Sequence, residues 1–380
     1  MLKSLISNTR RQQFASLLIF HAAYIWFRSF SNVVLPPHYL QQGISLQQMI
    51  IGSIIVFMAA SLLQIFKTHY ASKRSFRLAI ILTLVAVLLI IKITTVWQFY
   101  LSQAIFGLTI ISFYLIYNIA HFELTPRHRT GFSSAIFFSI YPLVSLITSL
   151  LAGLLAQANY LFIWILSGLF FFIPQYLVKF QKDFKVSYNL KLSLQAIKAT
   201  RSFIFLQGIW ESLLFGIIPV FSLYFIKSPL SYGAYMAYLS LMSVLANLLL
   251  GRYTDRVQKR ILFLYPLTLI MASLAFLFPL AISKVLWWVI ITGAVQFLRP
   301  IFWNVSTAFV IDSHPNLRQA IPAREFLLSL GRVFGLSLVL LNFLVQSKPT
   351  YIFYFLGTIM LIYPFLLFYN TKISKKYSYL

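Results

Sequence analysis

Twelve long apolar stretches run through this chain of 380 residues, and each approaches the length of a membrane-crossing helix. A hydrocarbon core of roughly 30 Å needs about 20 mainly apolar residues in helical form. Runs such as 78–91 are apolar throughout, whereas strands of a membrane barrel would alternate apolar and polar residues. The sequence therefore predicts an all-α membrane protein. Its helices are expected near residues 14–36, 49–66, 78–93, 96–118, 132–155, 158–178, 203–226, 230–250, 261–281, 285–309, 326–345 and 350–369.

The composition agrees with a membrane protein and excludes a water-soluble enzyme. Hydrophobic residues make up 60% and charged residues 10% of the chain, against roughly 45–50% and about 25% in soluble domains. The chain has no cysteine, which rules out disulfides, thiolate metal sites and cysteine nucleophiles. Its six acidic residues are scattered, so neither a paired-carboxylate catalytic site nor an acidic metal cluster is expected. We predict no enzymatic activity, no metal and no cofactor.

The basic residues predict the orientation, because Lys and Arg collect on the cytoplasmic side of a membrane protein. With the N-terminus inside, 24 of the 31 Lys and Arg fall in inner segments, 4 in outer loops and 3 inside helices. Both termini are therefore predicted to be cytoplasmic, in a multi-pass protein of the cell (plasma) membrane. Most of the basic residues behind the net charge of +25 lie on the predicted cytoplasmic side, where they contact anionic membrane lipid. Nucleic acid is therefore not an expected partner.

A hydrophilic, basic stretch at residues 179–202 divides the predicted helices into six and six. Shifting the first half forward by about 185–190 residues lays its helices over those of the second half, as expected for a duplicated six-helix unit. We predict bundles at 1–178 and 203–380, joined by a cytoplasmic linker at 179–202. Three apolar linker residues share one helical face, so a short interfacial helix is expected there. They are Leu190, Leu194 and Ile197.

One loop carries a motif. Residues 251–260 read Gly-Arg-Tyr-Thr-Asp-Arg-Val-Gln-Lys-Arg, which is a glycine, an acid four positions later followed by arginine, and then a basic pair. This loop resembles the signature loop of the major facilitator superfamily, which in that family stands between helices 2 and 3 and again between helices 8 and 9. The loop after the second predicted helix, at 67–77, keeps Lys73 and Arg74 but has His69 where the acid is expected.

The resemblance implies the fold of that superfamily, two pseudo-symmetric bundles of six transmembrane helices, and a transport function. In the family, the acid of this loop helps to latch the two halves in the outward-facing state. A gating role is thus implied for Gly251, Asp255, Arg256 and Arg260. Glu325 and Arg332 share one face of the eleventh helix, so we expect them to form a further cytoplasmic gate or a clamp between helices.

In the family, helices 1, 4, 7 and 10 line the central cavity, and here they carry most polar residues of the predicted spans. Ionisable groups inside a membrane are costly, so those that persist face the interior or a wet cavity. Arg28 and Arg299, from opposite halves, are predicted to bind an anionic group through forked hydrogen bonds. Alternatively, each pairs with Glu211 or a backbone carbonyl. The other predicted substrate-binding residues are His21, Tyr24, Gln207, Gln296 and Trp303.

Glu211 is the one carboxylate well inside a predicted span. Alternation between a desolvated environment and a nearby arginine would let it couple a proton to transport. The alternative is a static ion pair, with Arg28 or Arg299, that holds the halves together. In the eleventh helix, Gly331 and Gly335 are small enough to predict close packing against a neighbouring helix.

The leading hypothesis is a monomeric secondary transporter that works by alternating access and exports a small amphipathic or anionic organic compound, coupled to protons. Its expected partners are this small-molecule substrate, protons as coupling ion, and membrane lipid. Uptake or exchange of an organic anion is an alternative, and a non-transporting or lipid-handling protein of the same fold is another. The sequence has no GxxxxGK[ST] phosphate loop, which argues against ATP-driven transport.

Overall fold

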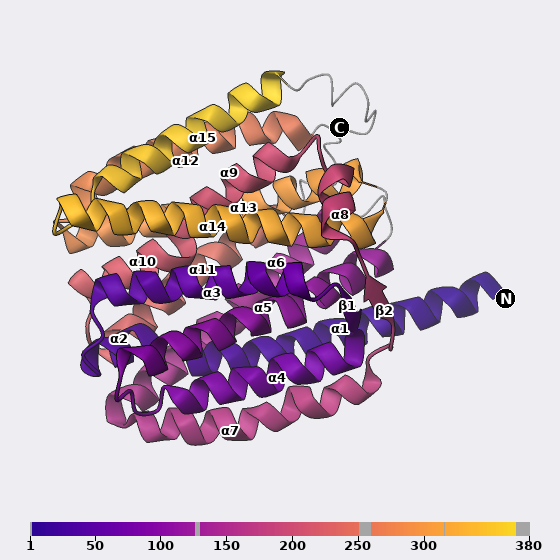
Figure 1. Cartoon of the computed structure of the whole chain (residues 1–380), viewed down its shortest axis with the longest axis horizontal. Coiled ribbons are helices and arrows are strands. Elements are labelled where there is room, and N and C mark those ends of the chain that lie inside the picture. Colours follow the sequence, from indigo (N-terminus) through magenta and orange to yellow (C-terminus); the bar gives the residue numbers. More distant parts are fainter. Residues whose placement is uncertain (1, 126–129, 251–259, 315, 370–380) are drawn as a thin grey trace.

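The computed structural model describes residues 2–125, 130–250, 260–314 and 316–369, and helices dominate it (Figure 1). The N-terminal half contains α1 (Leu2–Asn32), α2 (Leu35–Gln41), α3 (Leu46–Phe66), β1 (His69–Ala71), α4 (Ser72–Leu89), α5 (Val96–Leu124), α6 (Thr130–Ala158) and α7 (Tyr160–Leu177). Between the halves lie η2 (Val178–Phe180), β2 (Lys185–Ser187) and α8 (Leu190–Ala196). The C-terminal half contains α9 (Arg201–Ser212), η3 (Leu213–Ile217), α10 (Ile218–Phe221), η4 (Ser222–Tyr224), α11 (Pro229–Leu250), α12 (Arg260–Ala281), α13 (Val285–Ser313), α14 (Leu317–Val345) and α15 (Tyr351–Tyr369).

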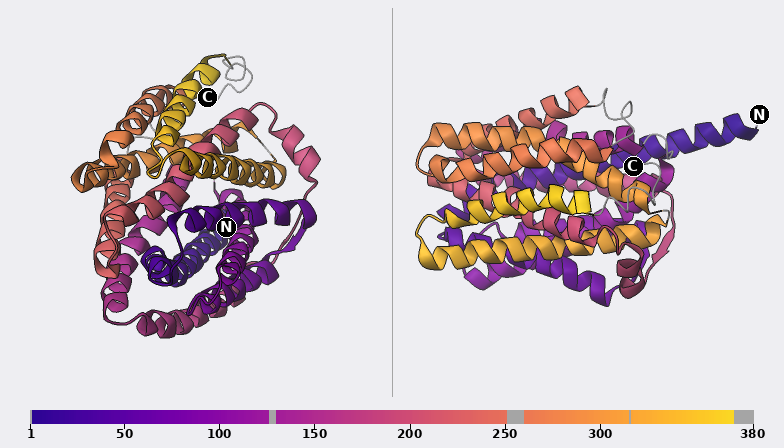
Figure 2. Two further views of the ribbon diagram at one scale, coloured as in Figure 1. Left: turned by 60° about the vertical axis from the view of Figure 1, so that its left-hand side comes forward. Right: turned by 90° about the horizontal axis from the view of Figure 1, so that it is seen from above.

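The long helices run side by side along one direction (Figure 2). The strands β1 and β2 and the helix α8 lie at one end of the bundle, which we call the linker end (Figure 1). The helix α1 begins and α15 finishes at this end, whereas α2 lies at the opposite end, which we call the far end. The placement of the start of α1 and the end of α15 on one side fits the predicted topology, and the assignment of that side to the cytoplasm stays a prediction.

Ten of the described helical segments are long and apolar enough to cross a membrane, and they correspond to ten of the twelve predicted spans. The other two predicted spans correspond to α4 and α15. The first turns of α4 carry Lys73, Arg74 and Arg77, which shorten its apolar part, and α15 offers a shorter apolar helix over Tyr351–Leu366. The multi-pass helical architecture is therefore confirmed, and the count of twelve spans stays a prediction.

Polar side chains fix where helices begin at the far end. Ser45 and Gln48 form a capping box at the start of α3: the Gln48 N–H donates to the Ser45 hydroxyl at 3.2 Å, and the Ser45 N–H donates to the Gln48 side chain at 2.8 Å. Asn159 separates α6 from α7 because its side chain accepts the Leu161 N–H at 2.8 Å. These caps satisfy N–H groups that the helices themselves leave unpaired.

The two halves meet mainly along two pairs of helices, α6 with α11 and α3 with α14, and further contacts join α6 to α13 and α5 to α14. In the first pair, the backbones approach closely at Gly153 and Gly233, near the far end. A Cβ atom added at Gly233 would lie 2.5 Å from the carbonyl oxygen of Ser149 and 2.8 Å from Cα of Gly153. Any larger residue at this point would force the two helices apart, so glycine permits this contact between the halves.

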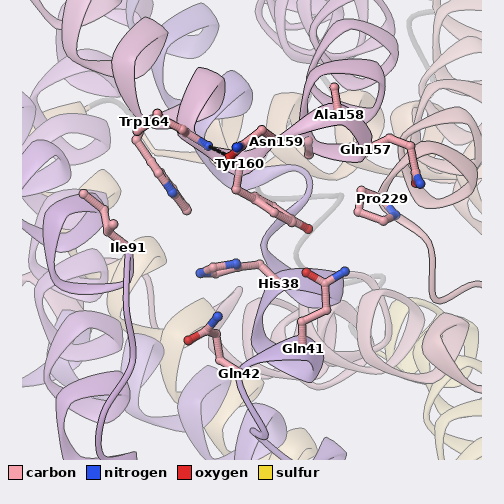
Figure 3. Close-up of a pocket in the computed structure, with 12 residues that line it drawn as sticks. His38, Gln41, Gln42, Ile91, Gln157, Ala158, Asn159, Tyr160, Trp164 and Pro229 are labelled. Atoms are coloured by element: carbon pink, nitrogen blue, oxygen red, sulfur yellow. Dashed lines mark hydrogen bonds between the residues drawn. The ribbon is translucent and has the colours of Figure 1, made fainter.

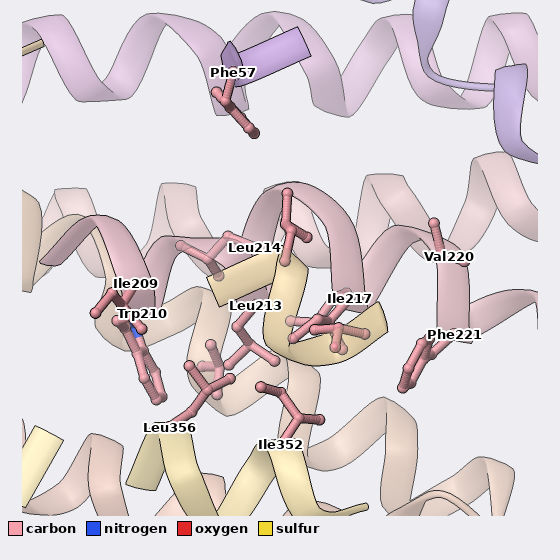
Figure 4. Close-up of a cluster of buried hydrophobic side chains, with 14 of the residues drawn as sticks. Phe57, Ile209, Trp210, Leu213, Leu214, Ile217, Val220, Phe221, Ile352 and Leu356 are labelled. Atoms are coloured by element: carbon pink, nitrogen blue, oxygen red, sulfur yellow. The ribbon is translucent and has the colours of Figure 1, made fainter. Parts of the chain in front are cut away.

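The seventh predicted span is a broken helix. It consists of α9, the π-helical turn η3, α10 and the 3-10 turn η4, and its buried side chains pack against α15 in the largest apolar cluster (Figure 4). Pro219, two residues beyond η3, has no N–H to donate and thereby disturbs the regular helical ladder. Phe57 of α3 reaches this cluster from the N-terminal half. Such π turns are frequent at functional sites, and this one follows Glu211 by two residues.

The linker contacts both halves. Its strand β2 pairs antiparallel with β1, with Tyr70 opposite Val186. Burial raises the pKa of Tyr188 to about 12, so the hydroxyl stays protonated and donates to the carbonyl oxygen of Gln64 at 3.1 Å. The helix α8 packs against α14, and the buried Ile197 belongs to a cluster formed largely by the C-terminal half. The predicted short helix in the linker is confirmed, its interfacial position stays a prediction, and the strand pairing was not foreseen.

Candidate functional site

A buried ion pair lies within the C-terminal half, next to the broken helix. Two nitrogens of Arg332, on α14, donate to the Oε2 atom of Glu211, on α9, and the Nε contact measures 2.8 Å. Gln207, one turn earlier, donates to the Oε1 atom of Glu211 at 2.8 Å. Only 2% of the Glu211 side chain is exposed. In the alternative of a static ion pair, the partners considered for Glu211 were Arg28 and Arg299, and this was wrong because its partner is Arg332.

Aromatic rings from both halves enclose this ion pair. The guanidinium carbon of Arg332 lies 5.0 Å from the ring centre of Phe57, on α3, and 4.7 Å from that of Phe215, in η3. The π turn directs Phe215 toward the boundary between the halves, where its ring also stacks 6.0 Å from that of Trp303. The ion pair of the C-terminal half is therefore in direct contact with the N-terminal half.

Arg28 of α1 has no carboxylate partner among the described residues. Its Nη1 atom donates to the hydroxyl of Tyr114 at 3.4 Å, and its guanidinium carbon lies 5.7 Å from the centre of the same ring. Tyr114 belongs to α5, so both contacts stay inside the N-terminal half. A hydroxyl group and a ring face compensate a positive charge only partly.

Arg299 of α13 is in a similar position in the C-terminal half. Its Nη2 atom donates to the hydroxyl of Ser243 at 3.2 Å, and its guanidinium carbon lies 4.9 Å from the ring centre of Trp303. Its Nε atom is buried and has no hydrogen-bond partner. Glu211 lies within electrostatic range of Arg299 but already accepts the bonds from Arg332. Arg299 thus has unused hydrogen-bond donors.

Tyr141 belongs to α6, which packs against both α1 and α13, and it lies within electrostatic range of Arg28 and of Arg299. Its side chain is 40% exposed. Arg28 and Arg299 also keep part of their surface accessible, although both are surrounded by helices. Each half thus places a partly accessible positive charge within electrostatic range of Tyr141.

The remaining predicted substrate-binding residues occupy different surroundings. Tyr24 packs its ring 3.7 Å from that of Phe113 and lies 3.5 Å, hydroxyl to hydroxyl, from Thr83. His21 is buried among aromatic rings, the nearest being Tyr117 at 4.1 Å, and neither ring nitrogen has a hydrogen-bond partner. These two residues are thus packed inside the N-terminal half, and their binding role stays a prediction.

Two further predicted residues lie closer to Arg299. Trp303 stands between Phe215 and Phe138 of α6, whose ring centre is 5.4 Å away, and its indole N–H has no partner. The side-chain oxygen of Gln296 is likewise buried without a partner, one turn before Arg299. Both side chains therefore offer polar atoms beside the arginine, and their binding role also stays a prediction.

At the linker end, polar contacts join the halves. Asn118 of α5 donates to the Oε1 atom of Glu325 at 3.2 Å, and Arg324 donates to the same oxygen at 2.6 Å. Nearer the surface, Arg318 donates to Glu123 at 2.7 Å. The predicted role of Glu325 at a gate or clamp fits its contact with Asn118, although Arg324, which the sequence analysis did not single out, is its charged partner.

Most of the signature loop lies outside the described residues. Gly251, Asp255 and Arg256 fall there, and the described chain resumes with Arg260 at the start of α12. The gating role of these four residues stays a prediction. In the corresponding segment at 67–77, Ser72 donates to the carboxylate of Asp183 in the linker at 3.1 Å, so an acid from outside this segment contacts it.

A recess of about 560 Å³ opens at the far end (Figure 3). It is formed by the end of α2, the turn between α6 and α7, and Pro229 at the start of α11. His38 lies in it, with its ring 4.6 Å from Tyr160 and 5.2 Å from Trp164. Its polar side chains are neutral amides and aromatic groups, so this recess carries none of the positive charge of the interior.

The second and eleventh predicted spans (α3 and α14) and the fifth and eighth (α6 and α11) meet at the boundary of the two halves. This fold is shared with solved structures of transporters of the major facilitator type. The chain is similar to the structure of the human organic anion transporter MFSD10 (TETRAN), with a TM-score of 0.69, 11% identity, and coverage of 93% of this chain and 99% of that one. It is also similar to a bacterial homologue of the iron transporter ferroportin in the outward-facing state, with a TM-score of 0.64, 16% identity, and coverage of 95% and 99%.

No protein-family model and no curated protein matches the sequence. Both similar structures are transporters and not enzymes. At such low identity, the likeness establishes the fold and leaves the substrate to be argued from the residues of this chain.

Proposed function

We propose that this protein is a secondary transporter that works by alternating access and binds an organic anion between Arg28 and Arg299. One observation carries the proposal: two arginines on opposite halves lie inside the bundle without a carboxylate partner among the described residues. Unpaired charge in a membrane interior is costly. A substrate carboxylate, sulfonate or phosphate would supply the missing negative charge and accept forked hydrogen bonds.

The surroundings of the arginines support a substrate with an apolar body. Trp303 carries Arg299 on its face, and Phe138 and Phe215 flank the tryptophan. Rings of this kind bind aromatic or aliphatic groups by burial of apolar surface. The two positive charges disfavour a metal ion or an organic cation at the same place. The name of the similar human structure, an organic anion transporter, agrees with this choice.

For the driving force and direction of transport we propose proton-coupled export, as the sequence predicts. Uptake or exchange of the anion is the alternative. Glu211 accepts three hydrogen bonds, which favours the ion-pair alternative for this residue over a proton carrier. In proteoliposomes, anion flux that follows an imposed pH gradient would support proton coupling. Flux that follows only the anion gradient or a counter-anion would support exchange.

Thermal unfolding of the purified protein in mild detergent tests the binding site. We expect organic anions to raise the melting temperature, because a ligand at a hundred times its dissociation constant stabilises by roughly 2.7 kcal/mol. The effect should vanish in Arg28→Gln and Arg299→Gln. Arg77→Gln is the matched control, since it removes the same charge from an exposed position on α4. Stabilisation by cations instead would contradict the proposal, and a response to lipid alone would favour the lipid-handling alternative.

A further inference from the structure

Among the described residues, the interior of the bundle holds two more positive than negative charges. Among the described arginines that are not exposed, those outside the first and last turns of the helices are Arg28, Arg299, Arg324 and Arg332. Only two carboxylates accompany them, and each is already taken: Glu211 pairs with Arg332 and Glu325 with Arg324. These two ion pairs account for their own charges, so Arg28 and Arg299 keep one uncompensated positive charge each.

We infer that the substrate carries two negative charges, an inference that rests on the proposed function. A monoanion bound between the arginines would compensate one charge and leave the other buried without a counter-charge. The cost of such a lone charge in a low-dielectric interior is several kcal/mol. A dianion compensates both, so it gains more from the same site than a monoanion of equal size.

The hydrogen-bond donors of the two arginines fit this requirement. A guanidinium group has five N–H donors in a fixed fork. Arg28 donates one hydrogen bond, to Tyr114, and Arg299 donates one, to Ser243, with its Nε unpartnered. Each guanidinium group can therefore donate two parallel hydrogen bonds to an anionic group, the geometry that gives the strongest hydrogen bonds.

The locations of Arg28 and Arg299 determine what the two negative charges of a dianion would connect. Arg28 belongs to α1 and Arg299 to α13, so the two forks lie on opposite halves, with Tyr141 in range of both. A dianion that binds both forks connects the halves, whereas a monoanion held by one fork does not. The second negative charge thus provides binding energy that depends on closure of the halves around the substrate.

The two charges can lie on separate groups or on one. Terephthalate has two carboxylates on one ring, and phenyl phosphate has a single group that is doubly charged above its second pKa of about 6. Benzoate is the matched monoanion, since it differs from terephthalate by one carboxylate only. These three probes share an aromatic ring, which keeps their apolar contacts comparable.

Binding of the three probes to the wild-type protein in detergent at pH 7.5 tests the inference by calorimetry. We expect terephthalate, phenyl phosphate or both to bind at least about tenfold more tightly than benzoate, because a charge-assisted hydrogen bond contributes about 1.5–3 kcal/mol. Tight binding of terephthalate alone would place the charges on separate groups, and tight binding of phenyl phosphate alone would place them on one. In Arg28→Gln and in Arg299→Gln the preference should fall to about twofold. Arg77→Gln should keep it.

Equal affinity of the wild-type protein for benzoate and both dianions would overturn the inference while leaving the anion site of the proposed function intact. A preference that persists unchanged in both arginine variants would also overturn it. Should either glutamine variant fail to fold, Arg28→Lys and Arg299→Lys keep the charge, and they should retain the preference for dianions with weaker binding overall. Failure of every anion to bind would overturn the proposed function itself.

Discussion

Glu211 of α9 and Arg332 of α14 form a buried ion pair in which one carboxylate oxygen accepts two hydrogen bonds from a single guanidinium group. Removal of one partner leaves the other charge buried and unpaired, which costs about 3–5 kcal/mol. We therefore expect Glu211→Gln and Arg332→Gln each to lower the free energy of unfolding by about that amount, measured by denaturant titration in detergent.

The double variant Glu211→Leu with Arg332→Met tests whether the single variants lose stability through an unpaired buried charge or through altered packing. It removes both charges, so it should be considerably more stable than either single variant. Wild-type stability of Glu211→Gln would contradict a structural role for the ion pair. If that variant also lost a proton-driven flux that the wild-type protein shows, the proton-carrier alternative would gain support.

Gly331 allows α14 to lie directly against α9. A Cβ atom added there would overlap the backbone oxygen of Phe205, and one added at Gly335 would lie 2.6 Å from the Ser212 hydroxyl oxygen. Overpacking of this kind costs typically about 1–3 kcal/mol. We expect Gly331→Ala to lower the melting temperature. Gly168→Ala is the control, because nothing lies within 4 Å of its added Cβ, and an equal loss in both variants would contradict the explanation.

His314, just beyond α13, makes stability depend on pH. Burial lowers its pKa to about 4, from an unfolded value near 6.5, and its Nε2 atom lies 3.0 Å from the Thr200 hydroxyl oxygen. Between pH 4 and pH 6.5 the unfolded chain binds more protons at His314 than the folded chain does. The contribution of neutral His314 to the free energy of unfolding is therefore fully present above pH 6.5 and is lost as the pH falls toward 4. His314→Gln should show a smaller loss of melting temperature between pH 7 and pH 4, and identical curves would refute this role.

Ser72, the first residue of α4, joins the N-terminal half to the linker by hydrogen bonds. Its hydroxyl donates to Asp183, and the same oxygen accepts the Phe184 N–H at 2.9 Å. Ser72→Ala removes both bonds, so the amides of residues 185–187 should exchange hydrogen more quickly, by a factor of about ten for a loss near 1 kcal/mol or slightly more. Ser273→Ala, which alters an exposed hydroxyl on α12, should leave this exchange unchanged. Unaltered exchange in Ser72→Ala would show that the strand pairing holds without it.

The sequence could predict the features that a lipid bilayer imposes on a helical membrane protein. Apolar length reveals the spans, and the small residues Gly331 and Gly335 reveal a close helix contact, because these features lie along a single segment. The partner of Glu211 could not be predicted in this way, since Arg332 is 121 positions away and only the packing of α9 on α14 brings them together. Arg324 was missed because it lay before the predicted start of its helix, whereas α14 begins at Leu317.

The strands β1 and β2 were missed for a different reason. Each has three residues, too few for a pattern of alternation, and their pairing joins segments more than a hundred positions apart. The positions of Arg28 and Arg299 inside helices could be predicted from sequence alone, because charge inside a long apolar run is conspicuous, and their binding role stays a prediction. Their lack of a carboxylate partner became visible only when the partners of the other charges were known.

The attachment of the linker on both sides sets a limit on how far the halves can separate. The strand β2 ends at Ser187, fastened to the N-terminal half, and α8 begins at Leu190 on the C-terminal half. Three peptide units span at most about 10 Å when fully extended. The linker is therefore a short tether, and the separation of the halves at this end cannot exceed that length unless β2 detaches or α8 leaves α14.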